Sequence, residues 1–172
     1  IAVLAIGAVF TMRSLGNNQG FAPEQPISYS HKLHAGDYKM QCLYCHFAAE
    51  RGRNAGIPPT EDCMNCHASM QPTLEGENDI KKLKDALASN KPVEWVKVHF
   101  LPDFVYFNHA QHVVIAGLRC QQCHGPVETF VVMRQDQPLT MGWCLDCHRK
   151  KQIAPPDDIK SASGGDCSKC HH

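Results

Sequence analysis

The pattern Cys-x-x-Cys-His occurs five times in this sequence, and the five copies use all ten cysteines. Two thiols at this spacing can each form a thioether bond with a vinyl group of a porphyrin, and the next histidine can bind the iron. The pattern therefore predicts five covalently attached haem c groups. The predicted attachment residues are Cys42, Cys45, Cys63, Cys66, Cys120, Cys123, Cys144, Cys147, Cys167 and Cys170. The predicted proximal iron ligands are His46, His67, His124, His148 and His171.

Paired cysteines also occur in zinc sites and in disulfide-rich proteins. A zinc ribbon combines two Cys-x-x-Cys units and does not need a histidine directly after each one. A disulfide framework leaves the five histidines unexplained. Haem attachment accounts for every cysteine and for the histidine that follows each pair, so we favour it over both alternatives.

Six histidines lie outside the five motifs. A haem iron that only transfers electrons usually has a second, distal protein ligand, whereas an iron that binds a small molecule leaves this position open. The additional histidines therefore favour electron transfer over a catalytic haem. The predicted distal ligands are His31, His34, His99, His109 and His112. His172 adjoins a proximal ligand and is the expected spare, while Met141, just before the fourth motif, is the main alternative ligand.

Two of the motifs belong to an internal repeat. Residues 29–46 recur as residues 107–124, because every shared position, such as His31 and His109, is displaced by 78 residues. In both copies an aromatic residue and two histidines precede the Cys-x-x-Cys-His motif. We therefore predict two diheme halves, about residues 27–77 and 105–150, and a fifth haem within residues 151–172. Repeats this short cannot bury a core of their own, so we expect the stacked cofactors to hold them together.

The composition also indicates that the cofactors form the core. Leu, Ile, Val and Phe make up only 37 of 172 residues, which is close to the level at which chains fail to build a hydrophobic core. The predicted fold is therefore a small, mainly α-helical and irregular multihaem cytochrome c. Basic and acidic residues balance at 17 each. Haem propionates would make the loaded protein acidic, which argues against a nucleic-acid partner.

Residues 1–12 read IAVLAIGAVFTM and are almost entirely apolar. As a helix they would span about 18 Å, less than the ~30 Å of a bilayer core, so we expect them to end a longer hydrophobic helix. A cleaved secretory signal is the alternative, but no clear small-residue cleavage site follows the apolar run. We predict a retained membrane anchor over residues 1–16. The pentahaem domain, residues 17–172, would then lie on the outer face of the cytoplasmic membrane, where haem is attached covalently.

Three local predictions complete the fold. The clearest helix outside the motifs is expected from Asp79 to Asn90, with Asn78 or Asp79 as its N-cap. Residues 95–106 are expected to be extended because Pro102 interrupts them. A short helix is expected at each motif because both thiols and the imidazole must face the same side.

The two histidines followed by Cys-x-x-Cys-His resemble the class III multihaem cytochromes, the cytochrome c3 and c7 group. A more specific resemblance covers nearly the whole chain. The apolar N-terminus and the segments ISYSHKLHAG, IPPTEDCMNCH, LPDFVYFNHAQHV, LTMGWCLDCHR and DCSKCH are together similar to the pentahaem subunit of bacterial alternative complex III. In that family the subunit lies on the periplasmic face of the membrane and is anchored by one helix.

The resemblance implies partners and a ligation scheme. The implied partners are an iron-sulfur subunit of molybdopterin-like type, polytopic quinol-binding membrane subunits and a monohaem cytochrome c. In the resembling families the first histidine of each pair ligates the haem of the motif that follows. His31 would then pair with His46, and His109 with His124. His34 and His112 would serve neighbouring haems, and His99 would serve the remaining one.

We therefore expect an electron-transfer subunit of a membrane quinol oxidoreductase, which relays electrons from a quinol-oxidising partner to a periplasmic cytochrome or oxidase. The chain itself is not expected to be an enzyme. A soluble periplasmic shuttle is one alternative, and a catalytic reductase with an open iron is another. The quinol-dehydrogenase subunit of a nitrite reductase system is a third. Its relatives typically have four haems and a methionine ligand near the first motif, where this chain has Phe47, Ala48 and Ala49.

Overall fold

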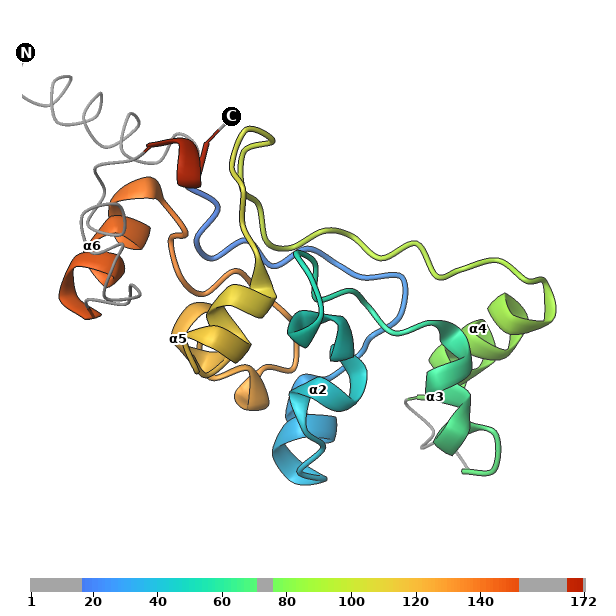
Figure 1. Cartoon of the computed structure of the whole chain (residues 1–172). Helices are drawn as coiled ribbons and strands as arrows, with labels where there is room; N and C mark the ends of the chain where they lie inside the picture. Colours follow the sequence, from blue (N-terminus) through green and yellow to red (C-terminus); the bar gives the residue numbers. More distant parts are fainter. Residues whose placement is uncertain (1–16, 71–75, 152–166, 172) are drawn as a thin grey trace, which may run out of the picture. The chain divides into compact units, whose positions relative to one another are not determined.

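The computed structural model describes residues 17–70, 76–151 and 167–171 (Figure 1). The predicted anchor over residues 1–16 and the predicted spare histidine, His172, lie outside this part of the chain. Within it, none of the helices is both long and apolar enough to cross a membrane.

The prediction of a mainly helical and irregular fold is confirmed for the described residues. They contain no strand, and Val105 and His171 form an isolated antiparallel bridge. The α-helices are α2 (Cys42–Cys45), α3 (Thr60–His67), α4 (Glu77–Ala88), α5 (Gln121–His124) and α6 (Met141–Lys151). The 3-10 turns are η2 (Phe47–Glu50), η4 (Val127–Thr129) and η6 (Cys167–Lys169), and the π-helical turns are η1 (Lys32–Asp37) and η3 (Gln111–Ile115). A short helix or turn is thus present at every Cys-x-x-Cys-His motif, as predicted.

The chain divides into two compact units. The first, here called the three-motif unit, comprises Ala22–Val98 and Asn108–Met133 and carries the first, second and third motifs. The second, here called the two-motif unit, includes His99–Phe107 and Arg134–His172 and carries the fourth and fifth motifs. The predicted boundaries of the two diheme halves stay a prediction.

The repeat predicted from the sequence has the same local backbone pattern in both copies. In the first copy, the amide of Met40 donates to the carbonyl of His34 at 3.0 Å, and the amide of His46 donates to Cys42 at 2.8 Å. In the second copy, the equivalent bonds join Leu118 to His112 and His124 to Cys120, both at 3.0 Å. A π-helical turn carries the second histidine in each copy. The same spacing of ligands therefore produces the same loop twice.

Helix α4 confirms the predicted helix, but it begins at Glu77 and ends at Ala88. The predicted N-cap is wrong, because Gly76 occupies that position and no side chain caps the helix. Asp79 instead lies inside the first turn. Its carboxylate accepts hydrogen bonds from the amide of Ser28 at 3.1 Å and from Nζ of Lys82 at 2.9 Å. The acidic residue thus ties the helix to a distant loop rather than starting it.

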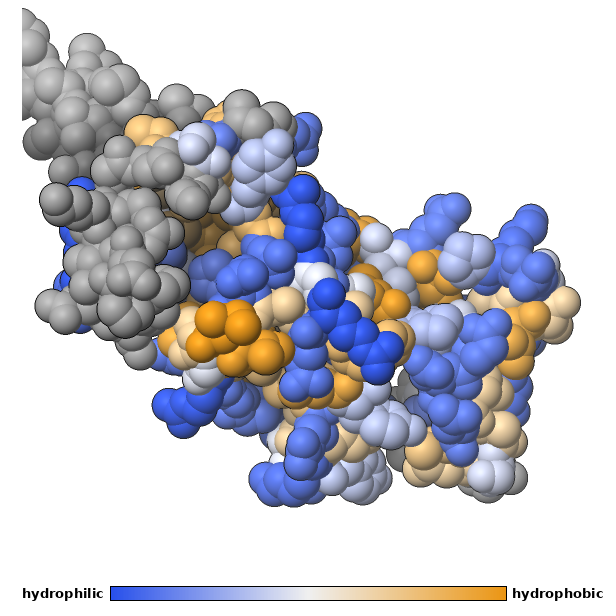
Figure 2. Space-filling model, in the orientation of Figure 1, coloured by the Kyte–Doolittle hydropathy of each residue, from blue (hydrophilic) through white to orange (hydrophobic). Residues whose placement is uncertain are grey.

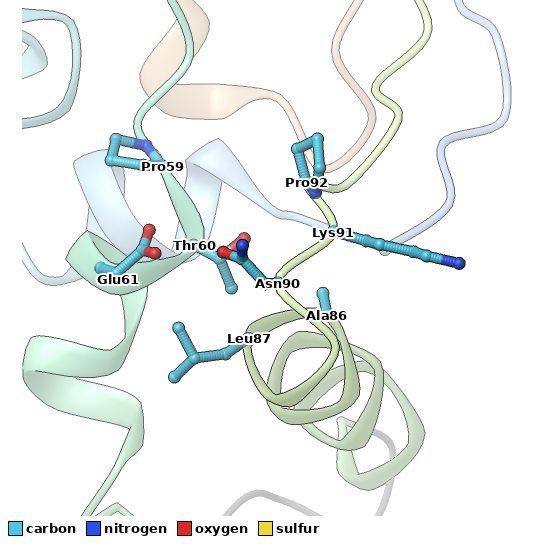
Figure 3. A pocket seen from close by; sticks show the side chains of 8 residues that line it. All are labelled: Pro59, Thr60, Glu61, Ala86, Leu87, Asn90, Lys91 and Pro92. Atoms are coloured by element: carbon cyan, nitrogen blue, oxygen red, sulfur yellow. The ribbon is translucent and has the colours of Figure 1, made fainter.

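The end of α4 is fixed by Asn90, which adopts a left-handed φ of 51°. The amide of Lys91 then reaches back to the carbonyl of Ala86 at 3.0 Å, a common way to end a helix. Helix α4 packs beside α3 (Figure 1). A hollow of about 160 Å³ lies between the start of α3 and the end of α4, with Leu87 directed toward it (Figure 3). It holds none of the predicted haem ligands.

The polypeptide buries very little apolar surface. In the described part of the chain, the buried hydrophobic residues are Ile27, Ala49, Leu83 and Phe130. Many large apolar side chains are exposed instead, for example Ile115 at 73% and Val131 at 60%. Figure 2 shows such residues in orange at the surface, among polar ones. Monomeric proteins rarely leave so much apolar surface uncovered without a function for it. This agrees with a core that a prosthetic group completes.

The two-motif unit is organised around one polar side chain. Gln135 is 1% exposed. Its Oε1 accepts a hydrogen bond from the amide of Phe100 at 3.2 Å, and its Nε2 donates to the carbonyl of Gln137 at 3.2 Å. Its backbone carbonyl accepts from Gly20 at 2.7 Å. Through its side chain and its backbone carbonyl together, Gln135 thus joins its own segment to those of Phe100 and Gly20.

Candidate haem-binding site

The ten cysteines are free thiols in this structure. Across the residues that the structure describes, no three histidine, cysteine or acidic side chains are grouped so that they could hold a metal ion by themselves. The thiols are instead paired along short helical segments, two to a motif.

Thiols of different motifs also meet one another in the three-motif unit. Burial raises the pKa of the Cys120 thiol, and Cys42, which is hydrogen bonded to it, raises this pKa further. Burial likewise raises the pKa of Cys63, and the nearby Cys45 adds to this increase. The attachment residues of the first motif therefore lie beside those of both the second and the third motifs.

The two-motif unit has a similar meeting point. Burial is the main cause that raises the pKa of the Cys144 thiol. The nearby Cys170 and Cys147 raise this pKa further. The fourth and fifth motifs thus bring their cysteines close together. The fifth motif is held in place by Tyr106, whose amide donates to the carbonyl of Cys170 at 2.7 Å. Its histidine, His171, lies 5.6 Å from the ring of Phe104, centroid to centroid.

The imidazoles of His109 and His124 are parallel to within 3°, and their centroids are 6.3 Å apart. Metal–nitrogen bonds of about 2.0–2.1 Å to both rings, with roughly 1.1 Å from each nitrogen to its ring centre, would separate the centroids by about 6.3 Å. The pair therefore has the spacing that a shared metal ion requires. The resemblance implied this pairing of a distal and a proximal ligand.

A second pair consists of His34 and His67, whose centroids are 6.0 Å apart with an interplanar angle of 56°. Burial lowers the pKa of His67, and His34 lowers it further. A neutral imidazole keeps the lone pair that binds iron. His34 belongs to the loop before the first motif and His67 to the second motif, so this pair also follows the implied scheme.

His31 is close to its implied partner as well. The pKa of His31 is lowered to about 4. Burial is the main cause, and the neighbouring His46 and His34 lower it further. Its Nδ1 is buried and has no hydrogen-bond partner within the described chain. A buried polar atom without a partner costs about 1–3 kcal/mol. A bound group that contacts this side chain would supply what the polypeptide lacks.

Four of the histidines bind a backbone carbonyl through Nδ1. Because a carbonyl can only accept a hydrogen bond, Nδ1 carries the proton and the lone pair remains on Nε2. Metal-binding histidines are usually oriented in this way. The four bonds are His34 to Ser30 at 2.9 Å, His46 to Gly56 at 2.7 Å, His109 to Arg53 at 2.6 Å and His112 to Asn108 at 2.8 Å.

The other predicted ligands are placed less specifically. His112 belongs to the three-motif unit, whereas His99 and His148 belong to the two-motif unit. Met141 is the first residue of α6 and is 61% exposed. Which iron His99 and His112 serve, and whether Met141 replaces a histidine, stay predictions.

A hollow of about 510 Å³ opens beside the second motif. It is lined by Met40, Gln41, Tyr44 and Cys66. Its volume lies in the range of about 300–1,000 Å³ that is usual for sites of small molecules and cofactors. Tyr44 lies within the first motif, Met40 and Gln41 precede it, and Cys66 belongs to the second motif, so the hollow lies between these two motifs. The cysteine pairs and the paired imidazoles are the kinds of donors that bind haem c, so the residues present fit this group.

Sequence reasoning did not assign a role to Tyr29. Its ring stacks on His34 with centroids 4.4 Å apart and meets His31 edge-on at 4.9 Å. Burial and the nearby thiols of Cys45 and Cys63 raise the pKa of Tyr29 strongly, so its hydroxyl stays protonated. The sequence did offer a signal for this role, because an aromatic residue, Tyr29 or Phe107, stands at the same position in both copies of the repeat. Arg53 and Gly56 accept hydrogen bonds from histidines through their backbone carbonyls. Every residue has such a carbonyl, so the sequence could not indicate these roles.

Comparisons with known proteins agree with this chemistry. The family model for cytochrome c7 and related cytochrome c matches residues 105–172. A curated relative, the menaquinone reductase multiheme cytochrome c subunit of Nitratidesulfovibrio vulgaris, is 37% identical over 101 residues. The match covers 59% of this chain and 46% of the relative, so the chain spans about half the length of that relative. The resemblance to the cytochrome c7 group is thus confirmed over the C-terminal part of the sequence.

Proposed function

We propose that this chain is a multihaem cytochrome c with five covalent haems, which relays electrons within a quinone-linked membrane oxidoreductase of the alternative complex III type. The observation that carries this proposal is the facing pair His109 and His124, at the spacing of a shared metal ion. Two histidines on one iron leave no open position for a substrate, which favours electron transfer over catalysis. The matches to multihaem cytochromes support the same conclusion.

The residues of the chain have three tasks in this proposal. The cysteine pairs fix each porphyrin, the paired histidines ligate its iron, and the surrounding side chains set the polarity around it. When bound, haem supplies an iron that accepts and returns one electron reversibly. Cysteines of different motifs lie near one another, such as Cys42 and Cys120, and in this proposal electrons pass between the porphyrins attached there.

The partners and the direction of transfer form the finer part of the proposal. We place the chain on the periplasmic face of the cytoplasmic membrane, anchored by residues 1–16. Its proposed partners are an iron-sulfur subunit, polytopic quinol-binding subunits and a monohaem cytochrome c. Electrons would enter from quinol oxidation. The name of the curated relative, a menaquinone reductase subunit, favours a second candidate with the opposite direction, in which electrons reach the quinone pool.

Copurification and kinetics test this function together. The chain should sediment with membranes and, in mild detergent, copurify with an iron-sulfur subunit and a polytopic quinol-binding subunit. Deleting residues 1–16 should leave five haems attached but slow electron transfer with the quinone pool. An anchorless protein that exchanges electrons with quinol-reduced membranes equally fast would favour the soluble shuttle instead. Reduction of the haems by added quinol, compared with their oxidation by added quinone, distinguishes the two directions.

Haem content provides the simplest check. Intact mass and haem staining after denaturing electrophoresis should show five haems per chain, because all five motifs are complete. Electron paramagnetic resonance should show low-spin iron throughout. A zinc-containing chain, or one with a high-spin haem in the native state, would contradict the proposal.

A further inference from the structure

The segment Gly52–Gly56 lies against the first histidine of the second copy. The carbonyl of Arg53 accepts two hydrogen bonds from His109, one from its amide at 3.3 Å and one from Nδ1 at 2.6 Å. The carbonyl of Gly52 accepts a third from the amide of Ala110 at 3.1 Å. The position and the ring orientation of His109 are therefore both set by a segment from the other half of the repeat.

The same segment also holds a histidine of the first motif. The carbonyl of Gly56 lies 2.7 Å from Nδ1 of His46. Gly56 has a left-handed φ of 73°, a conformation that is unfavourable for residues with a side chain. The direction of its carbonyl thus depends on the absence of a side chain. From Arg53 to Gly56, this segment thus orients His46 of the first motif and His109, which precedes the third motif.

We propose that Gly52–Gly56 acts as a clamp loop, which orients one axial ligand on each of two haems and couples their properties. The inference rests on the proposed function, because it takes His46 as the proximal ligand of the first haem and His109 as the distal ligand of the third. A hydrogen bond to Nδ1 fixes the ring orientation of an axial histidine and its strength as a ligand. A change in the loop therefore reaches both haems.

The meeting of the two motifs supports this coupling independently. Beyond the effect of burial, Cys42 lies close enough to the thiol of Cys120 to raise its pKa. The attachment sites of the first and third haems are thus adjacent on one side, while the clamp loop joins their ligands. In the His34–His67 pair, Nδ1 of His34 donates to the carbonyl of Ser30 and not to the clamp loop. The effect of the loop should be specific to two haems.

Gly56→Ala in the full-length, haem-loaded protein tests the clamp. An added Cβ would meet only the Cβ of Ala48 at 3.9 Å, an ordinary contact, so the change acts through the backbone rather than through a clash. The matched control is Gly20→Ala. Gly20 also has a left-handed φ, of 85°, and an added Cβ would have nothing within 4 Å, but its carbonyl binds no histidine.

The readouts are the electron paramagnetic resonance spectrum and the midpoint potential of each haem. The variant His109→Met identifies the third haem and His31→Met identifies the first. In Gly56→Ala, we expect the signals of these two haems to shift while the other three keep their positions, and the amide of His109 to lose protection from hydrogen exchange. Gly20→Ala should leave all signals in place.

Two contrary results can be told apart. If the native protein lacks low-spin haem with two axial histidines, the ligand assignment fails, and both the proposed function and the clamp fall. Alternatively, the native spectra are as proposed while Gly56→Ala fails to shift the expected pair of haem signals. A shift of no haem signal, of the first alone, or of all five would show that the clamp loop is wrong, and the proposed function would stand.

Discussion

In the two copies of the repeat, residues 29–46 and 107–124, the loops that carry the histidines have the same backbone pattern but are stabilised differently. Both carry the second histidine on a π-helical turn and fix its Nδ1 on a carbonyl four residues earlier, Ser30 in one copy and Asn108 in the other. The first histidines differ. Nδ1 of His109 binds the carbonyl of Arg53, whereas Nδ1 of His31 is buried and has no hydrogen-bond partner among the described residues. Ligand spacing thus determines the loop, and the surroundings determine how each ligand is held.

Two further positions show the same difference. Gly36 in the first copy faces the carbonyl of Glu128, where no side chain would fit, but the equivalent Val114 is 53% exposed. Lys39 has a left-handed φ of 57°, while the equivalent Gly117 has the same conformation, at 61°, without strain. The first copy is thus the more closely packed and the more strained one. The predictions below test whether these differences matter.

The largest effect should come from removing a first histidine. His31→Ala and His109→Ala should each convert one haem from low-spin to high-spin and change its potential, because each removes one of two axial ligands. His172→Ala, the expected spare, is the control and should change nothing. Optical spectra of the oxidised protein measure the spin state. If only one of the two variants responds, the copies do not ligate in the same way and the comparison fails.

Candidate ligands could be predicted from the sequence because haem attachment requires a fixed pattern of cysteines and histidines. The Cys-x-x-Cys-His motifs and the histidine pairs are recognised by their spacing. The same spacing predicts a short helix at each motif. The N-cap of α4 was misjudged because Asp79 is used for tertiary hydrogen bonds to Ser28 and Lys82 instead. The close approach at Gly36 and the carbonyl of Gly56 were not predictable, since no side chain marks them. Sequence patterns reveal chemistry carried by side chains and miss chemistry carried by the backbone.

Gly36→Ala should destabilise the protein by about 1–3 kcal/mol, the usual cost of overpacking. The new Cβ would collide with the backbone carbonyl of Glu128, which cannot move aside as a flexible side chain would. Helical turn η1 would then separate from η4, and the hydrogen bond from the amide of Lys32 to Phe130, now 2.8 Å, would lengthen. Thermal unfolding of the haem-loaded protein measures the change.

Val114→Ala is the matched control for Gly36→Ala. It alters the equivalent position of the second copy, where the side chain is largely exposed, and should change stability by less than about 0.5 kcal/mol. An equal loss in both variants would show that the two copies are packed alike, against the comparison drawn above.

Tyr29→Leu should cost about 1 kcal/mol beyond any loss of burial, because it removes the stacking on His34 and the edge contact with His31. The His34 ring should also turn, which changes the spectrum of the haem that it shares with His67. Tyr29→Phe keeps the ring and makes the first copy resemble the second, where Phe107 stands. It should therefore retain both stability and spectrum. If Tyr29→Phe has the full effect of Tyr29→Leu, the hydroxyl rather than the ring is responsible.

The smallest effect should come from exchanging the two residues in the left-handed conformation. Lys39→Gly should stabilise the protein by about 0.5–1 kcal/mol, because relief of an unfavourable φ outweighs the greater freedom of glycine in the unfolded chain. Gly117→Lys should destabilise the second copy by a similar amount. Neither variant touches a ligand, so all five haem spectra should stay the same while the unfolding temperatures move in opposite directions. If Lys39→Gly is destabilising, the Lys39 side chain contributes a contact that offsets its strain, and the two loops are more different than their backbones suggest.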